Sequence, residues 1–287
     1  MSGQLRRLKN RIRSVENTQK ITRAMEMVAA AKLHRFQDMM QKGRAYAKGL
    51  ESLLERLSAE ENIVLAHPLL EEREEKKAAV ILFTSDAGLC GTFNSDLIQM
   101  ALEFIRSREI PLSLVSVGKF GAAELERKGH SFDRKFGDIR TSQVETFLKE
   151  LTEYLAELFI SKKVDSLYAV SSHVLSLSSF SNNITPLLPI KKPQISPASA
   201  SSDYIFEPDQ TVILNRLAPL FFESKIRQVF LEAYVSEQIA RMRAMHQATE
   251  NAKDMIKALT LKRNKARQAA ITKELIEIVS GSEALKS

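Results

Sequence analysis

The chain has 287 residues, a single cysteine and a formal net charge of +7. This length suffices for one large domain or for a domain with an appendage. Because Cys90 stands alone, the sequence excludes an internal disulfide and a thiolate metal cluster, which fits a reducing compartment. The basic start MSGQLRRLKN is followed by no apolar signal region, and no stretch approaches the roughly 18 apolar residues of a membrane span. We therefore expect a soluble chain, or one held at a membrane through a partner.

The positive charge lies at the two ends of the chain. Residues 1–57 have a balance of +8 and residues 220–287 one of +4, whereas residues 58–219 have a balance of −5. Basic ends predict an acidic partner, which could be a nucleic acid, an anionic lipid surface or an acidic protein.

The first 60 residues have the pattern of one long helix, of roughly 80 Å if about 55 residues are helical. The phase slips between Val15 and Ile21, so we expect a strict heptad to fail there. The apolar residues recur at three- and four-residue intervals through Leu5, Leu8, Ile12, Val15, Ile21, Met25 and Val28.

The C-terminal arm has a similar pattern, in which Pro219 predicts the helix start and Gly281 its end. Alanine dominates the stripe, which would let two helix axes approach closely. Two arms of matching length are expected to pair antiparallel; the alternative is that both pack on the central region. The predicted stripe comprises Ile226, Phe230, Ala233, Ala240, Ala244, Ala248, Met255, Leu259, Ala266, Ala269 and Ile276.

The middle of the chain alternates strand and helix patterns. Apolar runs predict strands at 78–86, 110–118 and 164–174, with a possible fourth at 184–190, and amphipathic stretches between them predict helices. This order is typical of a doubly wound sheet of parallel strands. We expect the charged run 71–77 to be a solvated linker and 196–204 to be a loop. The predicted domains are 1–60, 75–205 and 215–287.

Chemically active groups are sparse. The turn SDAGLCGTFNSD (85–96) follows a strand, where a phosphate could bind, but it offers only Gly88 and Gly91 and matches neither a dinucleotide nor a P-loop motif. A tight turn with a buried Cys90 is the favoured interpretation, since no second group pairs with Asp86. The five histidines have no ligand spacing, and His173 is expected in the core or at a sheet edge. We predict no catalytic, cofactor or metal site.

Four segments resemble the gamma subunit family of F-type ATP synthases: NTQKITRAMEMVAAAKL (17–33), SDAGLCGTFN (85–94), SEQIARMRAMHQATENAKDMI (236–256) and NKARQAAITKELIEIVSG (264–281). The resemblance implies an α/β fold in which N- and C-terminal helices form a long antiparallel coiled coil with an inserted doubly wound, Rossmann-like domain. It also implies a non-catalytic central-stalk rotor, one copy per complex, that couples ion flow to cycling of three catalytic β subunits.

The implied partners are the α3β3 hexamer, the epsilon subunit and the membrane c-ring, and the implied location is the cytoplasmic face of a bacterial plasma membrane. Nucleic acid is not expected as a partner. Two alternatives stay open: a nucleic-acid-binding coiled-coil protein and a nucleotide-using α/β enzyme. By resemblance, the residues that contact the β subunit are Arg267, Gln268, Thr272, Met25 and Arg23. The apolar tip that turns in a collar is Ile271, Leu275, Ile276, Ile278 and Val279.

The turn departs from the family pattern at two positions. Ala87 replaces a usual basic residue and Thr92 a usual glycine, so the resemblance implies no β contact through that basic group in this chain. With Cys90 as the sole cysteine, thiol regulation of the chloroplast type is excluded.

Overall fold

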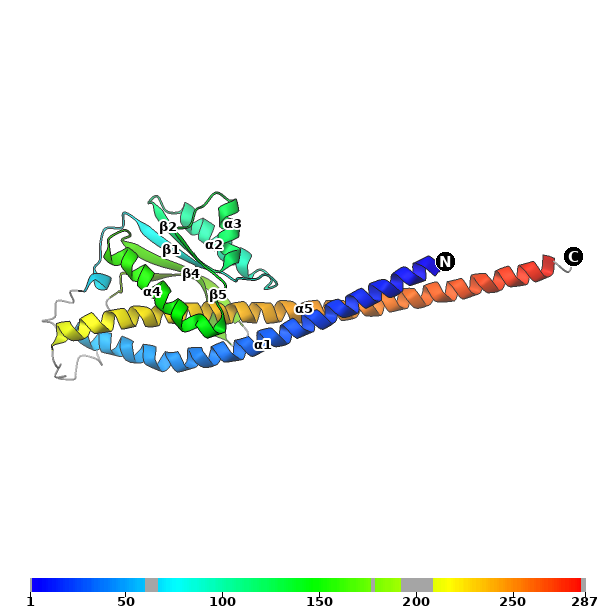
Figure 1. Cartoon of the computed structure of the whole chain (residues 1–287), viewed down its shortest axis with the longest axis horizontal. Helices are drawn as coiled ribbons and strands as arrows, with labels where there is room; N and C mark the ends of the chain where they lie inside the picture. The colour runs from blue at the N-terminus through cyan, green and yellow to red at the C-terminus, as the bar shows by residue number, and fades with distance from the viewer. Residues whose placement is uncertain (1, 60–66, 177–178, 192–208, 285–287) are drawn as a thin grey trace. The chain divides into compact units, whose positions relative to one another are not determined.

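The computed structural model describes residues 2–59, 67–176, 179–191 and 209–284 (Figure 1). Contacts divide the chain into two compact units. Unit 1 combines Met1–Ala30 with Arg241–Ser287, and unit 2 comprises Ala31–Ala240. The two long helices, α1 (Ser2–Ala59) and α5 (Gln210–Ala284), each contribute a segment to both units.

Helix α5 extends past both predicted ends. Pro219 lies inside the helix rather than in its first turn, although a proline there removes a backbone hydrogen bond. The turns before it are held by burial, since Leu214, Leu217 and Ala218 are 5% exposed or less. At the other end the helix continues through Gly281 to Ala284, because glycine permits helical backbone as well as ending it.

The buried face of α1 keeps an unbroken heptad spacing, so the predicted failure after Val15 is wrong. Polar residues occupy seam positions there, whereas Ile21 and Val28 are 59% and 57% exposed. The sequence pattern failed because it followed hydrophobicity and the seam does not. In unit 1 the buried and half-buried seam positions of α1 are Leu5, Leu8, Ile12, Val15, Gln19, Thr22, Glu26 and Ala29.

The α5 seam of unit 1 also differs from the predicted alanine stripe. Met255, Ala269 and Ile276 are exposed. The pairing is antiparallel as expected, since Thr22 lies opposite Thr249 while Glu26 lies opposite His246. The predicted Ala244 and Ala248 are half-buried. The buried and half-buried positions that follow the heptad spacing are Met242, Met245, Thr249, Ala252, Ile256, Leu259, Arg263, Ala266 and Ala270.

Unit 2 contains one five-stranded sheet with the order β3-β2-β1-β4-β5. Strands β1 (Ala78–Phe83), β2 (Leu112–Val117), β3 (Arg134–Phe136) and β4 (Ser166–Ser176) are parallel, and β5 (Ser179–Leu188) is antiparallel to β4. The short β3 was not predicted, and β5 starts earlier than the predicted 184–190. The expected loop 196–204 lies outside the described residues.

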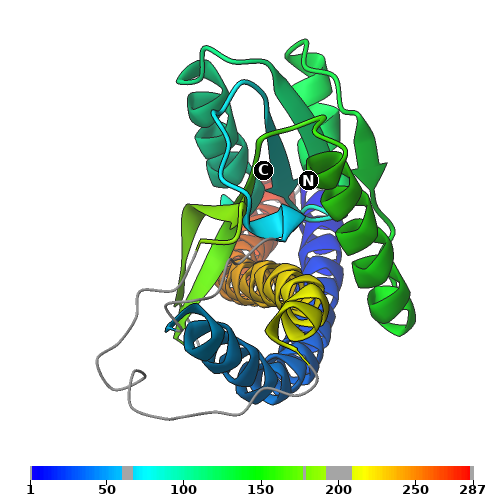
Figure 2. The ribbon, with the colours of Figure 1, turned by 90° about the vertical axis from the view of Figure 1, so that its left-hand side faces the viewer.

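Helices cover both faces of this sheet. Right-handed crossovers place α2 (Phe93–Arg106) and α3 (Lys119–Arg127) on one face and α4 (Val144–Ile160) on the other (Figure 2). Short 3-10 helices span Pro68–Leu70 and Thr141–Gln143. The predicted doubly wound α/β arrangement is confirmed for the parallel strands.

The α5 segment of unit 2 lies among the other layers (Figure 2). Its Tyr234 stacks on Phe36 of α1 with ring centroids 4.0 Å apart. Phe230 contacts Phe147 of α4 at 5.1 Å. Glu232, only 2% exposed, contacts His173 of β4. This segment of α5 is therefore part of the core of unit 2.

The charged run 71–77 is not a fully solvated linker. The Arg73 guanidinium lies 4.6 Å from the centroid of the Phe159 ring and donates a hydrogen bond to the Phe159 carbonyl at 3.1 Å. Glu75 accepts from Arg108 at 3.0 Å. These contacts attach the run to the sheet domain.

Candidate functional site

The turn after β1 is held by its own side chains. The backbone N–H of Ser85 donates to Asn94 Oδ1 at 3.0 Å, and Asn94 Nδ2 donates to Ser85 Oγ at 2.7 Å. Asn94 Nδ2 also lies 3.3 Å from Cys90 Sγ, and Cys90 is buried. These contacts agree with the predicted tight turn, and they give the polar groups of the turn a structural role.

Asp86 also has a structural role. Its Oδ1 accepts from the backbone N–H of Lys119 and its Oδ2 from that of Ile139, each at 3.2 Å. The carboxylate thus joins the first turn of α3 to the segment after β3. Both of its oxygens are used in this way, which leaves Asp86 poorly placed as a catalytic base.

The carboxyl ends of β1 and β2, where α/β sheets usually bind nucleotides, are covered by α5. The cavity that remains has a volume of about 30 Å³. That volume holds about two water molecules and is far below the roughly 300–1,000 Å³ of a small-molecule site. Within the described residues, no three His, Cys, Asp or Glu side chains gather as metal ligands. The cavity is lined by residues that include Phe83, Thr84, Val117, Phe230 and Tyr234.

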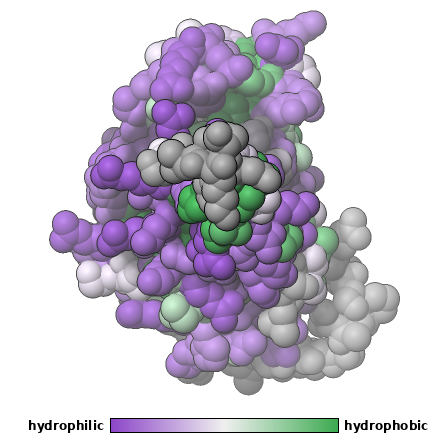
Figure 3. All heavy atoms as spheres, turned by 90° about the vertical axis from the view of Figure 1, so that its right-hand side faces the viewer, coloured by the Kyte–Doolittle hydropathy of each residue, from purple (hydrophilic) through white to green (hydrophobic). Residues whose placement is uncertain are grey.

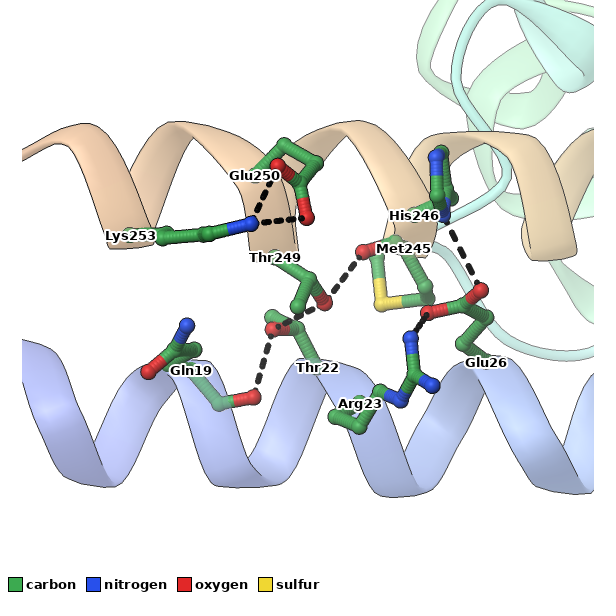
Figure 4. Close-up of polar contacts among 9 residues, drawn as sticks. All are labelled: Gln19, Thr22, Arg23, Glu26, Met245, His246, Thr249, Glu250 and Lys253. Atoms are coloured by element: carbon green, nitrogen blue, oxygen red, sulfur yellow. Dashed lines mark hydrogen bonds and ion pairs between the residues drawn. The ribbon is translucent and has the colours of Figure 1, made fainter.

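A polar layer crosses the helix seam of unit 1 (Figure 4). Thr249 Oγ1 lies 2.8 Å from Thr22 Oγ1, and both side chains are buried. Thr22 in turn donates to the carbonyl of Gln19 at 3.1 Å. Thr249 Oγ1 also lies 2.8 Å from the Met245 carbonyl oxygen, so its single proton serves two acceptors, that carbonyl and the Thr22 hydroxyl.

A charged cluster borders this layer. Glu26 Oε1 lies 3.1 Å from Nδ1 of His246 on the opposite helix, and Glu26 Oε2 lies 3.5 Å from the Arg23 guanidinium. The Arg23 side chain is 60% exposed and that of Glu26 is 18% exposed. Of the predicted contact residues, Arg23 therefore faces solvent beside this cluster, and Met25 is half-buried.

The other predicted contact residues lie farther along α5. Arg267, Gln268 and Thr272 are exposed. They follow Thr249 by about 20 residues, a distance on the order of 30 Å along a helix. The structure thus separates the predicted residues into two regions of unit 1 rather than bringing them together.

Every residue from 271 to 280 is exposed, including the five predicted for the apolar tip. Large aliphatic side chains in water are unusual at this density and indicate a surface that a partner covers. Figure 3 shows a group of hydrophobic residues near the centre of the face seen from this end. The exposed fractions are 48% for Ile271, 56% for Leu275, 60% for Ile276, 67% for Ile278 and 61% for Val279.

Comparisons with known proteins agree along almost the whole chain. A family model described as ATP synthase matches residues 4–285. The ATP synthase gamma chain of Pelotomaculum thermopropionicum is 39% identical over 98% of this chain and 99% of that protein. The gamma chain of Moorella thermoacetica is 40% identical with the same coverage. The chain belongs to the ATP synthase gamma-chain family. These relatives are all named ATP synthase gamma chains, and the comparisons give no support to the nucleic-acid alternative.

Solved structures agree in fold. A chain from the mitochondrial ATP synthase of Euglena gracilis, in an assembly of OSCP, F1 and c-ring, matches with a TM-score of 0.68 and 16% identity, covering 99% of this chain and 95% of that chain. A chain from the central stalk and c-ring of the Tetrahymena thermophila enzyme matches with a TM-score of 0.62 and 22% identity, covering 79% and 99%. No helix in the described part of this gamma-family chain is apolar and long enough to cross a bilayer.

Sequence reasoning missed several surface features of this family member. Ile21 and Val28 point outward seven residues apart, and Glu26 and His246 form an interhelical pair. A signal for the first two exists in the sequence, because they are out of phase with the heptad that runs from Leu5 to Leu57. Nothing in the sequence pattern identifies the pairing of Glu26 with His246.

Proposed function

We propose that this chain is the rotating central-stalk subunit of an F-type ATP synthase. One copy stands inside an α3β3 hexamer, and its other end binds the epsilon subunit and a membrane c-ring. Ion flow turns the ring and the chain with it, and the asymmetric surface of the chain drives the three catalytic β subunits through their conformations. The complex lies at the cytoplasmic face of a bacterial plasma membrane, where the chain is peripheral.

The observation that carries this proposal, together with family membership, is the exposed end of α5. Ten consecutive helical residues, 271–280, have no buried side chain, and five of them are large aliphatics. An apolar collar that surrounds such a helix removes these side chains from water without fixing its angle, because apolar contact is not directional. That combination suits an axle that must be held in place and still rotate.

Below the tip, Arg267 and Gln268 offer directional contacts. Both are exposed in unit 1. Charge-assisted hydrogen bonds from Arg267 to an acidic β-subunit loop are stronger than neutral ones, and they depend on rotational angle because donor and acceptor must meet. Thr272 adds a hydroxyl one turn further. We assign Met25 and Arg23 to a second contact with the β subunits, beside the outward-facing Ile21 and Val28.

The chemistry belongs to the hexamer in this proposal. The covered carboxyl edge of the sheet supports a non-catalytic role, since α5 takes the place that a nucleotide occupies in α/β enzymes. In this proposal the inserted domain packs against α1 and α5 and holds these helices together.

The deciding experiment is co-purification with α and β subunits, in which we expect a 3:3:1 ratio. Within that complex, Arg267→Ala with Gln268→Ala should lower coupled turnover several-fold and leave the unfolding temperature of the chain unchanged. Lys262→Ala, an exposed position on the same helix, is the matched control. Unchanged torque and turnover in the double variant would contradict the assigned contact, and nucleotide turnover by the chain alone would contradict the whole proposal.

A further inference from the structure

We propose that Glu26 and His246 position Arg23 for an acidic partner surface, and that this task explains the carboxylate in the seam of unit 1. The inference deepens the proposed function and depends on it. Arg23 touches the partner in this account, whereas Glu26 and His246 act through Arg23.

Glu26 stands at a seam position where an apolar residue would pack better. It occupies the heptad place between Thr22 and Ala29, and its side chain is only 18% exposed. Its Oε2 atom is buried and makes no hydrogen bond with the described residues. A carboxylate in such a place loses hydration that an aliphatic side chain would not need. The residue is therefore poorly explained by stability alone.

Two cationic or proton-donating groups surround this carboxylate from different helices (Figure 4). His246 of α5 contacts Oε1 at 3.1 Å, and Arg23 of α1 approaches Oε2 at 3.5 Å. The histidine contact is short enough for a hydrogen bond, whereas the arginine contact is not. Glu26 is thus fixed across the seam by His246 and attracts Arg23 loosely.

The long ion pair with Glu26 leaves the Arg23 guanidinium able to bind a partner. Its side chain is 60% exposed, and an ion pair of this length at a surface contributes little stability. The guanidinium has five N–H donors, which can bind a partner carboxylate through two parallel hydrogen bonds. An acidic side chain that arrives at this face can therefore take the guanidinium from Glu26 with little loss.

His246 allows Arg23 to return to Glu26 after a partner carboxylate has left. While Arg23 binds the partner, His246 keeps Glu26 in its place, so the carboxylate does not swing into solvent. When the partner leaves, Arg23 finds the same carboxylate 3.5 Å away and returns to its former direction. Between contacts, Glu26 thus keeps the Arg23 guanidinium at one place on the edge of the seam, from which a partner can take it.

Unit 1 contains a second carboxylate–cation pair that lies outside the helix seam and can serve as a control. Glu250 pairs with Lys253 on the same helix at 3.2 Å, and both side chains are about half exposed. This pair has the same charges as Glu26 and Arg23, yet no hydrogen bond or ion pair drawn in Figure 4 joins it to a residue of α1. Glu250→Gln therefore controls for the loss of one surface carboxylate.

The test uses the full chain assembled with its catalytic subunits and compares Arg23→Gln, Glu26→Gln, the double variant, His246→Gln and Glu250→Gln. We expect Arg23→Gln and Glu26→Gln each to lower ATP-driven ion pumping about threefold to tenfold. Pumping by the double variant should be no lower than that of the weaker single variant, because both changes remove the same partner contact.

Glu26→Asp should retain more pumping than Glu26→Gln. His246→Gln should lie between Glu26→Gln and the unchanged chain, and Glu250→Gln should match the latter.

The unfolding temperature of each full chain separates positioning from structure. Glu26→Gln should leave it unchanged or raise it, since an amide costs less to bury than a carboxylate. The inference is overturned by normal pumping in Glu26→Gln, by independent, multiplying effects of the two changes, or by a fall in unfolding temperature that parallels the loss of pumping. If the unchanged chain does not assemble with α and β subunits, the proposed function falls as well; if it assembles and pumps, only the inference is at stake.

Discussion

Arg227 of α5 binds both carboxylate oxygens of Glu145 at the start of α4, at 2.6 and 2.5 Å. These hydrogen bonds lower the pKa of Glu145 and raise that of Arg227. The Glu145 side chain is 64% exposed, so solvent screens the pair. We predict that Glu145→Gln lowers the free energy of unfolding at pH 7 by roughly 0.2–1 kcal/mol, the range measured for solvent-exposed ion pairs.

The pH dependence of that loss follows from the lowered pKa of Glu145. A group whose folded-state pKa is depressed stabilises the fold above its unfolded value, here 4.5, and loses the effect as pH falls through the folded value. The difference between Glu145→Gln and the unchanged chain should therefore shrink below pH 4.5 in urea unfolding. Glu153→Gln, exposed on the same helix, should have no effect at either pH, and a loss for Glu145→Gln that is equal at pH 7 and pH 3 would refute the assignment.

The role of a residue could be predicted where its contact partners lie close to it in the sequence, and could not where they lie far away. The buried Cys90 and the tight turn around it follow from a strand, two glycines and a helix in immediate succession. Asp86 was identified only as an unpaired carboxylate, because its backbone partners at Lys119 and Ile139 lie 33 and 53 residues away. The pairing of Glu26 with His246 spans 220 residues and has no signature in either segment.

Helix α1 contains glycines whose positions demand nothing of a glycine. A Cβ placed on Gly43 or Gly49 meets no atom within 4 Å. Since glycine in a helix interior costs about 1 kcal/mol relative to alanine, Gly43→Ala and Gly49→Ala should each raise the free energy of unfolding by roughly 0.5–1 kcal/mol. Thermal and urea unfolding of the full chain measure this change.

Gly118→Ala is the opposite control for that pair of substitutions. Gly118 has a φ of 96°, and a Cβ there would lie 2.1 Å from the carbonyl oxygen of Thr84. The substitution should destabilise unit 2 by at least about 2 kcal/mol, from backbone strain and a clash with main-chain atoms. Equal effects of alanine at positions 43 and 118 would mean that helix propensity and local space do not decide these outcomes.

The helices as elements were predicted well, and their faces were not. Long runs without proline, at three- and four-residue spacing, are enough to predict α1 and most of α5. The seam was misassigned because Gln19, Thr22 and Glu26 occupy it while Ile21 and Val28 face outward. Hydrophobicity marks every surface that is removed from water, including one that a partner covers, so it cannot by itself distinguish the seam from a contact face.

At the scale of the molecule, alternation of strands and helices predicted the doubly wound sheet of unit 2. It did not predict the antiparallel β5, since the run 179–183 is serine- and asparagine-rich, nor the three-residue β3. The family was recognisable because its motifs lie at both ends of the chain and in the first turn of the sheet. The covering of the sheet's carboxyl edge by α5 joins segments about 150 residues apart, which a pattern within short windows does not contain.

The last prediction concerns the end of α5. Ala270 is the last residue of the described helix with a buried side chain. A chain ended after Ala270 loses residues 271–280, none of which has a buried side chain, together with the residues that follow them. Its hydrogen-exchange protection at Ile12 and Val15 should equal that of the full chain, while pumping by the assembled complex falls several-fold as the apolar tip is lost. A chain ended after Thr249 also loses Leu259, whose burial contributes roughly 1.5–3 kcal/mol, so protection at Ile12 should disappear. Loss of that protection in the longer chain, or full pumping without residues 271–287, would show that this end is part of the fold rather than a surface kept for a partner.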